Sequence, residues 1–241
     1  MKNKLVDTLK LNKDLSKLGL NIHTFGNASI RYKNFCLIKP SGANLSKLKY
    51  SDISVVDIYS KKKISGKKPS VDLDTHLEIY RNFDNINSIV HMHSVYATSW
   101  AQAKKPIPCY GTTHADYYLR EIPITKNINS KQVKKNYEHQ TGRLVVLKIK
   151  KLKINPLNIP GILVSSHGPF AWGSNSKEAL SNAQTMEYIA KLAFNTETIN
   201  KKIKSIPKFL QYKHYKRKIG PNSYYGQSIN KRKKNDKTKW S

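Results

Sequence analysis

Short apolar segments alternate with longer amphipathic stretches along most of this 241-residue chain. Runs rich in Ile, Val and Leu predict strands at 35–38, 53–58, 88–93 and 161–165. Apolar residues at helical spacing predict helices at 5–18, 71–83, 176–194 and through Ala97, Trp100 and Ala101. Alternation of strands and helices of these lengths is typical of an α/β or α+β domain.

Local signals mark several ends of these elements. Gly19 ends the first predicted helix, and Asp72 or Asp74 begins the second. Asn175 is the expected N-cap of the last helix, with Glu178 in capping-box register. No repeat and no linker rich in Gly and Ser divides the sequence, so we expect one folded domain over 1–227. Residues 228–241 carry a Lys/Arg run without apolar periodicity, which predicts a solvated tail without fixed structure.

The formal net charge of +29 invites a nucleic-acid-binding interpretation. However, 38 of the 44 basic residues are Lys and only six are Arg, the residue preferred for bidentate phosphate and base recognition. Lys, Asn and Ile have A/T-rich codons and are abundant here, whereas Ala is scarce. Drift in an AT-rich genome therefore explains the charge, and nucleic-acid binding is the weaker hypothesis.

The sequence contains no apolar run long enough to cross a bilayer and no secretory signal pattern at its start. Its two cysteines, Cys36 and Cys109, are far apart and have neither a CxxC nor a zinc-finger spacing. A disulfide framework is excluded, and we expect a cytoplasmic protein in a reducing compartment.

Two histidines lie two residues apart at the end of a predicted strand. On a strand, His91 and His93 would leave the same face roughly 6–7 Å apart, close enough for both to bind one cation. An isolated HxH pair is also compatible with a polar sheet face.

His167 strengthens the metal interpretation because it follows another apolar strand, where functional residues gather on α/β scaffolds. Three histidines with an open position are typical of a catalytic zinc. Asp72 can add a carboxylate ligand or accept a hydrogen bond from a ligand histidine, and its alternative role is a helix N-cap.

Two small segments, 26–29 (GNAS) and 39–42 (KPSG), are suited to binding an anion through backbone N–H groups, hydroxyls and a Lys. Segment 69–70 (PS) adds a hydroxyl beside Asp72. Each is also a turn signature, so an ordinary turn is the alternative.

Taken together, these segments resemble the class II aldolase family and, within it, the L-ribulose-5-phosphate 4-epimerases. The resemblance runs in order from about residue 5 to 227. The matching motifs are GNAS (26–29), KPSG (39–42), KPSVD (68–72), IVHMHSVYATSWAQA (89–103), GTTHADYY (111–118), SHGPFAWG (166–173), KHYKRK (213–218) and YYGQ (224–227).

The resemblance implies a three-layer α/β/α domain with a central, largely antiparallel sheet, assembled as a homotetramer with sites at subunit interfaces. It implies one Zn²⁺ per subunit, with Mn²⁺ as the alternative, bound by Asp72, His91, His93 and His167. The implied acid/base pair is Asp116 and Tyr225, acting on a neighbouring subunit's site. The implied substrate and phosphate contacts are Gly26, Asn27, Ser41, Gly42, Ser70, Val71 and Thr112.

The implied reaction interconverts L-ribulose 5-phosphate and D-xylulose 5-phosphate by retro-aldol cleavage between C3 and C4 and recondensation on the other aldehyde face. A carbon without an acidic C–H cannot be inverted by simple deprotonation, and two faces call for two proton-transferring groups. Val71 departs from the pattern, since a second serine is expected there, and the loss predicts weaker substrate affinity.

The competing enzymatic hypothesis is an aldolase of the fuculose-phosphate type that releases its aldehyde. Asp72 in place of a glutamate and the THAD motif (113–116) argue against it. The sequence leaves arabinose and ascorbate catabolism open as the source of the substrate.

Overall fold

The computed structural model describes residues 1–218 and 223, so Tyr225 and the predicted tail, 228–241, lie outside the described residues. Within the described part of the chain, seven strands form one sheet in the order β4-β3-β2-β1-β5-β7-β6. All neighbouring strands in it are antiparallel. The strands are β1 (Asn27–Tyr32), β2 (Phe35–Ile38), β3 (Ser54–Asp57), β4 (Lys63–Ser65), β5 (Ser88–His91), β6 (Gly161–Val164) and β7 (Gly168–Gly173).

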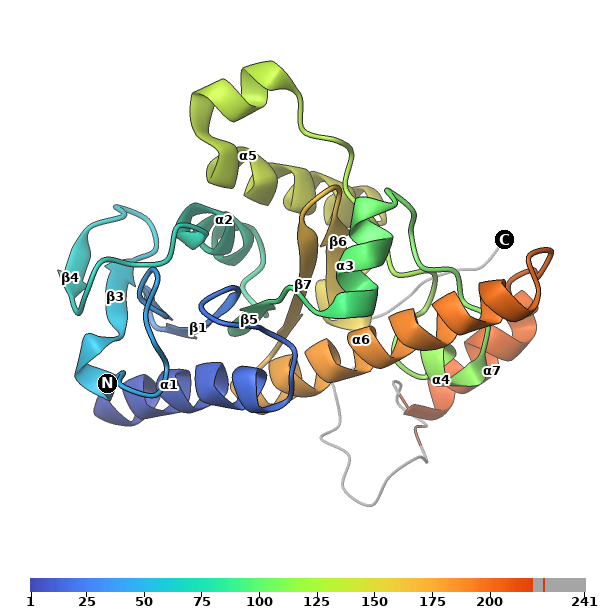
Figure 1. The fold of residues 1–241 in the computed structure, drawn as a ribbon, viewed down its shortest axis with the longest axis horizontal. Helices are drawn as coiled ribbons and strands as arrows, with labels where there is room; N and C mark the ends of the chain where they lie inside the picture. The colour runs from blue at the N-terminus through green and yellow to red at the C-terminus, as the bar shows by residue number, and fades with distance from the viewer. Residues whose placement is uncertain (219–222, 224–241) are drawn as a thin grey trace.

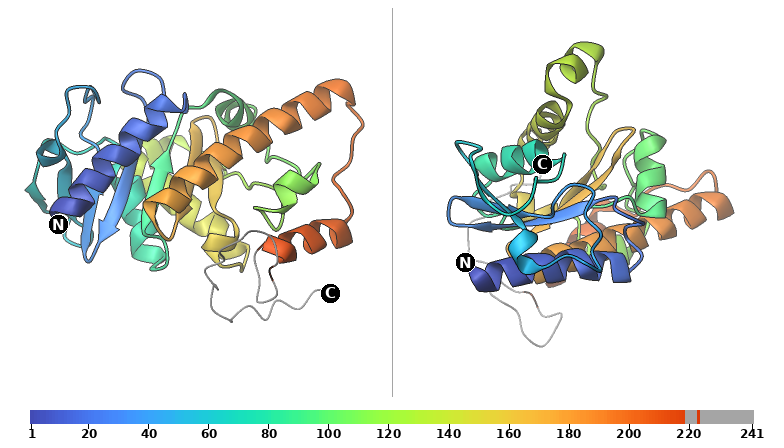
Figure 2. Two further views of the ribbon diagram at one scale, coloured as in Figure 1. Left: turned by 90° about the horizontal axis from the view of Figure 1, so that it is seen from below. Right: turned by 60° about the vertical axis from the view of Figure 1, so that its left-hand side comes forward.

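Helices cover both faces of this sheet (Figures 1 and 2). Helices α1 (Lys2–Lys17) and α6 (Ser176–Ile199) lie along one face, and α2 (Leu73–Asn82) and α5 (Ser130–Lys151) lie along the other. The other described helices are α3 (Val95–Gln102), α4 (Thr112–Ala115), α7 (Lys208–Lys218) and the 3-10 turns Tyr50–Asp52 and Pro156–Asn158. The expected three-layer α/β/α architecture is confirmed.

Burial on both faces explains why the central strands contain continuous apolar runs. All four residues of β5 are buried, and so are all six of β7, which pairs with it. Polar and apolar residues alternate only when one face of a sheet meets water. Each buried Ile, Val or Phe side chain in this layer contributes about 1.5–3 kcal/mol to folding.

The start of α6 follows the sequence signal. The side chain of Asn175 accepts a hydrogen bond from the Glu178 backbone N–H. The Glu178 carboxylate does not complete a capping box. It accepts instead from the backbone N–H and hydroxyl of Ser174, 2.9 and 2.5 Å away, and so fixes the chain as it leaves β7.

Several elements were not expected from the sequence, and β1, β7 and α5 are the ones that shape the core. Segment 26–29, interpreted as an anion-binding turn, contains the start of β1, which is central in the sheet. Strand β7 follows β6 after a tight turn, and α5 is a long, Lys-rich helix with little apolar periodicity. The predicted strand 88–93 ends at His91, because the chain turns there to enter α3.

Candidate active site

Three histidines from two strand ends converge at one point. His91 is the last residue of β5, His93 lies in the loop before α3, and His167 lies in the turn between β6 and β7. One ring nitrogen from each falls within 4.8 Å of the others. The Nε2 atoms of His91 and His93 are 3.0 Å apart. The three rings that the sequence predicted to share a site therefore lie together, although the two-residue strand spacing is not the reason, because His93 lies beyond the end of β5.

Two of the three rings, those of His91 and His167, have neighbours that restrict their orientation. The His91 ring stacks on Phe170, with centroids 4.2 Å apart, and its Nδ1 lies 3.0 Å from the Pro169 carbonyl oxygen. That carbonyl can only accept, so Nδ1 carries the proton and Nε2 presents a lone pair to the cluster. The His167 Nδ1 lies 3.2 Å from the Tyr137 hydroxyl.

The cluster has the electrostatic properties of a metal site. Burial holds the pKa of His91 well below its usual value, and the neighbouring imidazoles lower it further. Burial also lowers the pKa of His93 and of His167. The rings are therefore neutral at pH 7, the form that binds a cation. Ligand atoms of a tetrahedral zinc lie about 3.3–3.4 Å from one another, so the donor set fits such an ion.

His93 and His167 open into a pocket of about 330 Å³. The pocket brings together most of the residues predicted to bind metal or substrate. Its lining consists of Thr24, Phe25, Gly26, Asn27, Lys39, Ser41, Gly42, Ser70, Val71, Asp72, His93, Tyr137, Glu138 and His167.

Asp72 lies in this pocket but outside the three-histidine set. It occupies the N-cap position of α2, yet its side chain makes no capping hydrogen bond. Its Oδ2 accepts instead from Asn27 Nδ2 at 2.7 Å. The carboxylate therefore faces the site rather than its own helix, which favours a functional role over a capping one.

Five of the lining residues are not among the predicted site residues: Thr24, Phe25, Lys39, Tyr137 and Glu138. Lys39 is only 3% exposed, and its ammonium group donates to the Thr24 and Gly26 carbonyl oxygens at 2.7 and 3.2 Å. Burial lowers the Lys39 pKa, and the Asp72 charge opposes that shift. Tyr137 and Glu138 come from α5. Lys39 stood within the KPSG motif, whereas no sequence signal marked Tyr137 and Glu138.

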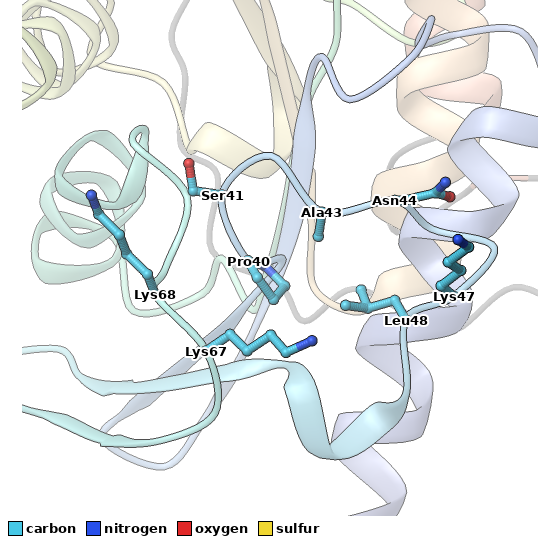
Figure 3. A pocket seen from close by; sticks show the side chains of 8 residues that line it. All are labelled: Pro40, Ser41, Ala43, Asn44, Lys47, Leu48, Lys67 and Lys68. Atoms are coloured by element: carbon cyan, nitrogen blue, oxygen red, sulfur yellow. The ribbon is translucent and has the colours of Figure 1, made fainter.

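A second hollow of about 340 Å³ shares Ser41 with the first. Figure 3 shows the side chains that line this second hollow. Three lysines line it, but one of them, Lys67, is paired with Asp52 at 3.2 Å. Lys68 points away from Lys47 and Lys67 in Figure 3. The charges do not converge, so the hollow lacks the geometry of an anion site.

Thr112 and Asp116 do not line the histidine pocket. They belong to α4 and its C-cap, and α4 packs beside α7, away from α2 and α5 (Figure 1). Both oxygens of Asp116 are engaged by Arg217, at 2.8 and 2.7 Å, and Oδ1 lies 3.2 Å from His214 Nδ1. Tyr225 lies outside the described residues. Within one chain, therefore, Asp116 is not assembled with the histidine cluster.

Comparison with known proteins agrees with this architecture. Residues 6–194 match the family model described as class II aldolase and adducin N-terminal domain. An L-fuculose 1-phosphate aldolase superimposes with a TM-score of 0.73 at 23% identity, covering 89% of this chain and 96% of the other.

Two further structures show the same fold. YgbL of Klebsiella pneumoniae, named as a candidate aldolase, epimerase or decarboxylase, gives a TM-score of 0.70 at 22% identity over 88% of this chain and 97% of its own. The L-fuculose-1-phosphate aldolase of Thermus thermophilus gives 0.62 at 21% identity over 85% of this chain and 100% of its own. None of the described helices has the length and hydropathy to cross a membrane.

Proposed function

The chain belongs to the class II aldolase family, and on that premise we propose that it is a metal-dependent L-ribulose-5-phosphate 4-epimerase. One observation carries the proposal. Three neutral, buried or half-buried imidazoles converge at a pocket that also holds a lysine, an amide and two serines. A metal cluster beside polar anion-binding groups suits a phosphorylated sugar.

His91, His93 and His167 would hold the metal, with the Asp72 carboxylate beside them. When bound, a divalent ion acts as a Lewis acid that stabilises negative charge on sugar oxygens. Zn²⁺ suits three imidazoles, and Mn²⁺ is the alternative. Because the pKa values of these histidines are lowered, the rings are neutral near pH 7 and can bind a metal without first releasing a proton.

The pocket residues supply the substrate contacts. Asn27 is 3% exposed, and its Oδ1 has no partner among the described residues, so it can accept a hydrogen bond from a sugar hydroxyl. Ser41, Gly42, Ser70 and the backbone at Val71 would bind the phosphate, with Lys39 nearby. The N-terminus of α2 also faces the pocket at Asp72, and its dipole favours an anion.

Proton transfer on the two aldehyde faces is assigned to Asp116 and Tyr225, with Thr112 near the phosphate. Asp116 lies outside its own chain's pocket, so we assign these residues to the pocket of a neighbouring copy in a homotetramer. Both Asp116 oxygens are held by Arg217 within one chain. To act in the pocket of a neighbouring copy, the Asp116 carboxylate would have to exchange its bidentate pair with Arg217 for contacts there.

An aldolase of the fuculose-phosphate type is the second candidate, because several structures with this fold carry that name. The two reactions share the cleavage step and differ in whether the aldehyde is retained. Asp72, in place of the longer glutamate expected in an aldolase, favours the epimerase.

A coupled assay distinguishes the two candidates. We expect purified protein with added Zn²⁺ to convert L-ribulose 5-phosphate into D-xylulose 5-phosphate, and a chelator to abolish the conversion. Release of a free aldehyde from L-fuculose 1-phosphate, without epimerisation, would establish the aldolase instead. Salt-sensitive DNA binding without either activity would revive the nucleic-acid hypothesis.

A further inference from the structure

Helix α5 consists of two helical segments joined at one extended residue. Asn136 has φ −178° and ψ 100°, which is not helical. The first segment begins with a capping box formed by Asn129 and Gln132. Asn136 then caps the second segment, because its Oδ1 accepts from the His139 backbone N–H at 2.9 Å. The segment 137–151 therefore has its own N-terminus, and Tyr137 is its first residue.

The first turn of α2 holds this N-terminus in place. Asn136 Nδ2 donates to Asp74 Oδ2 at 3.0 Å, and the other Asp74 oxygen is 2.8 Å from Lys61 Nζ. The Thr75 hydroxyl donates to the Glu138 carbonyl oxygen at 2.7 Å. These bonds tie the start of the second segment to residues adjacent to Asp72.

Gly142 allows the two helices to pack this closely. A Cβ at position 142 would lie 2.7 Å from Glu78 Cβ and 3.1 Å from Thr75 Cα. Any larger residue would push α5 away from α2. The position of Tyr137 is consequently set by α2, the same helix that presents Asp72 to the pocket.

Tyr137 reaches from this N-terminus to the metal cluster. Its hydroxyl lies 3.2 Å from His167 Nδ1, and the two ring centroids are 6.0 Å apart. With Nδ1 bonded to the phenol, Nε2 of His167 is left to bind the metal. A ligand histidine usually has such a partner on its second nitrogen. His91 has the Pro169 carbonyl, which is built into the adjoining strand, whereas His167 depends on a side chain from a separate helix.

We propose that Tyr137 is a positioning residue for His167 and that the Asn136–Asp74 pair sets the metal affinity by holding Tyr137 in place. The inference rests on the proposed three-histidine metal site. It adds that the metal affinity depends on the break in α5. The break positions Tyr137, and Tyr137 orients His167, which lies 30 residues further along the chain.

The first experiment measures the zinc dissociation constant of the full-length protein by competition with a chromogenic chelator. Tyr137→Phe keeps the ring and removes the hydroxyl. We expect it to raise the dissociation constant about 10–100-fold, the usual effect of losing such a partner. Tyr59→Phe is the matched control, because Tyr59 is 62% exposed and is not among the residues lining the site. It should leave zinc binding unchanged.

The second experiment separates two hydrogen bonds of Asn136: the capping bond from the His139 N–H and the bond to Asp74. Asn136→Asp still accepts from the His139 N–H but places a carboxylate against Asp74, so zinc binding should weaken while helix content is retained. Adding Asp74→Asn restores an amide–carboxylate bond with donor and acceptor exchanged. We expect this second change to recover most of the zinc affinity.

The outcomes distinguish this inference from the proposed function. Wild-type protein that binds no zinc would overturn the metal site itself, and this inference with it. Tight binding by the wild type with an unchanged constant in Tyr137→Phe would overturn only the role of Tyr137. If zinc binding weakens in Asn136→Asp and the added Asp74→Asn fails to recover it, the proposed role of the Asn136–Asp74 pair is wrong. Urea unfolding of each variant shows whether a loss of affinity merely follows a loss of stability.

Discussion

The two regions that carry the predicted chemistry differ in how completely one chain assembles them. In the histidine pocket, ring nitrogens converge while Asn27 Oδ1 remains buried without a partner among the described residues. In the α4–α7 corner, the Asp116 carboxylate is already satisfied by Arg217 and His214. In the first region the Asn27 amide oxygen is open to a ligand, whereas in the second the Asp116 charge is balanced by Arg217.

This difference bears on whether a ligand or a second copy of the chain would complete each region. Buried polar atoms without partners are costly unless a ligand completes them, by about 1–3 kcal/mol each. The buried Asn27 Oδ1 therefore leaves a hydrogen-bonding position in the pocket that a ligand can fill. The Asp116 carboxylate has no such need in isolation, and the proposed homotetramer assigns its chemistry to contact with a second copy.

The largest effect is expected in the histidine cluster. His91→Asn removes one of the three imidazoles, and we expect it to lose bound zinc and nearly all activity while keeping the fold. Metal analysis and circular dichroism would test this together. His23→Asn is the control, since His23 is exposed and its φ of 53° is one that Asn tolerates. Full zinc occupancy in His91→Asn would end the assignment.

The predicted acid/base pair should affect turnover without affecting metal binding. We expect Asp116→Asn and Tyr225→Phe each to lower epimerisation about 10²–10⁴-fold, the usual scale for one acid/base group. Zinc content should not change, because neither residue is one of the predicted metal ligands. Condensation of dihydroxyacetone with an added aldehyde should survive in Tyr225→Phe. Unchanged epimerase turnover in Tyr225→Phe would show that this residue only packs.

Mixing inactive variants tests whether the two regions meet across subunits. His93→Asn and Asp116→Asn should restore part of the activity when combined, because some sites then receive two intact halves. A mixture of His91→Asn and His93→Asn is the control, since both changes fall in the same half, and it should stay inactive. Light scattering that shows an active monomer would contradict shared sites.

A smaller effect is expected at the wall of the pocket. Val71 is 63% exposed and cannot donate a side-chain hydrogen bond to phosphate. Val71→Ser should lower KM about tenfold or more, because a hydrogen bond to a charged group contributes about 1.5–3 kcal/mol. Val71→Ala controls for the lost volume and should leave KM nearly unchanged. If the serine variant behaves like the alanine variant, the phosphate lies elsewhere.

The mildest test concerns stability in the α4–α7 corner. Burial lowers the pKa of His114 to about 4, below the usual 6.5. As the pH falls below 6.5, the unfolded chain binds a proton that the folded chain does not, so stability is lost on acidification. The loss from pH 7 to pH 5 should be about 2 kcal/mol for this group. Urea unfolding of zinc-free His114→Asn should show a pH dependence smaller by that amount, and an equal dependence would contradict neutral burial.

Most strands and helices that the sequence predicted are present, because their signals are local. Strand β2 was expected at the residues where it occurs, and α6 begins after Asn175 as predicted. Strand β1 was missed because Gly26 and Ser29 resemble turn residues, and only pairing with β2 and β5 makes that segment a strand. Helix α5 was missed because its break at Asn136 and its many lysines obscure any apolar period.

The sequence by itself determined the chemistry of the site: three histidines, an aspartate and small polar segments in an order that resembles one family. Only the tertiary structure decided which of these groups share a pocket. His93 joins His91 through the loop that leaves β5, Tyr137 arrives because α2 holds the second segment of α5, and Asp116 is held at the far corner by Arg217. Residue types follow from composition and spacing, whereas convergence depends on contacts between segments far apart in the chain, which no local pattern encodes.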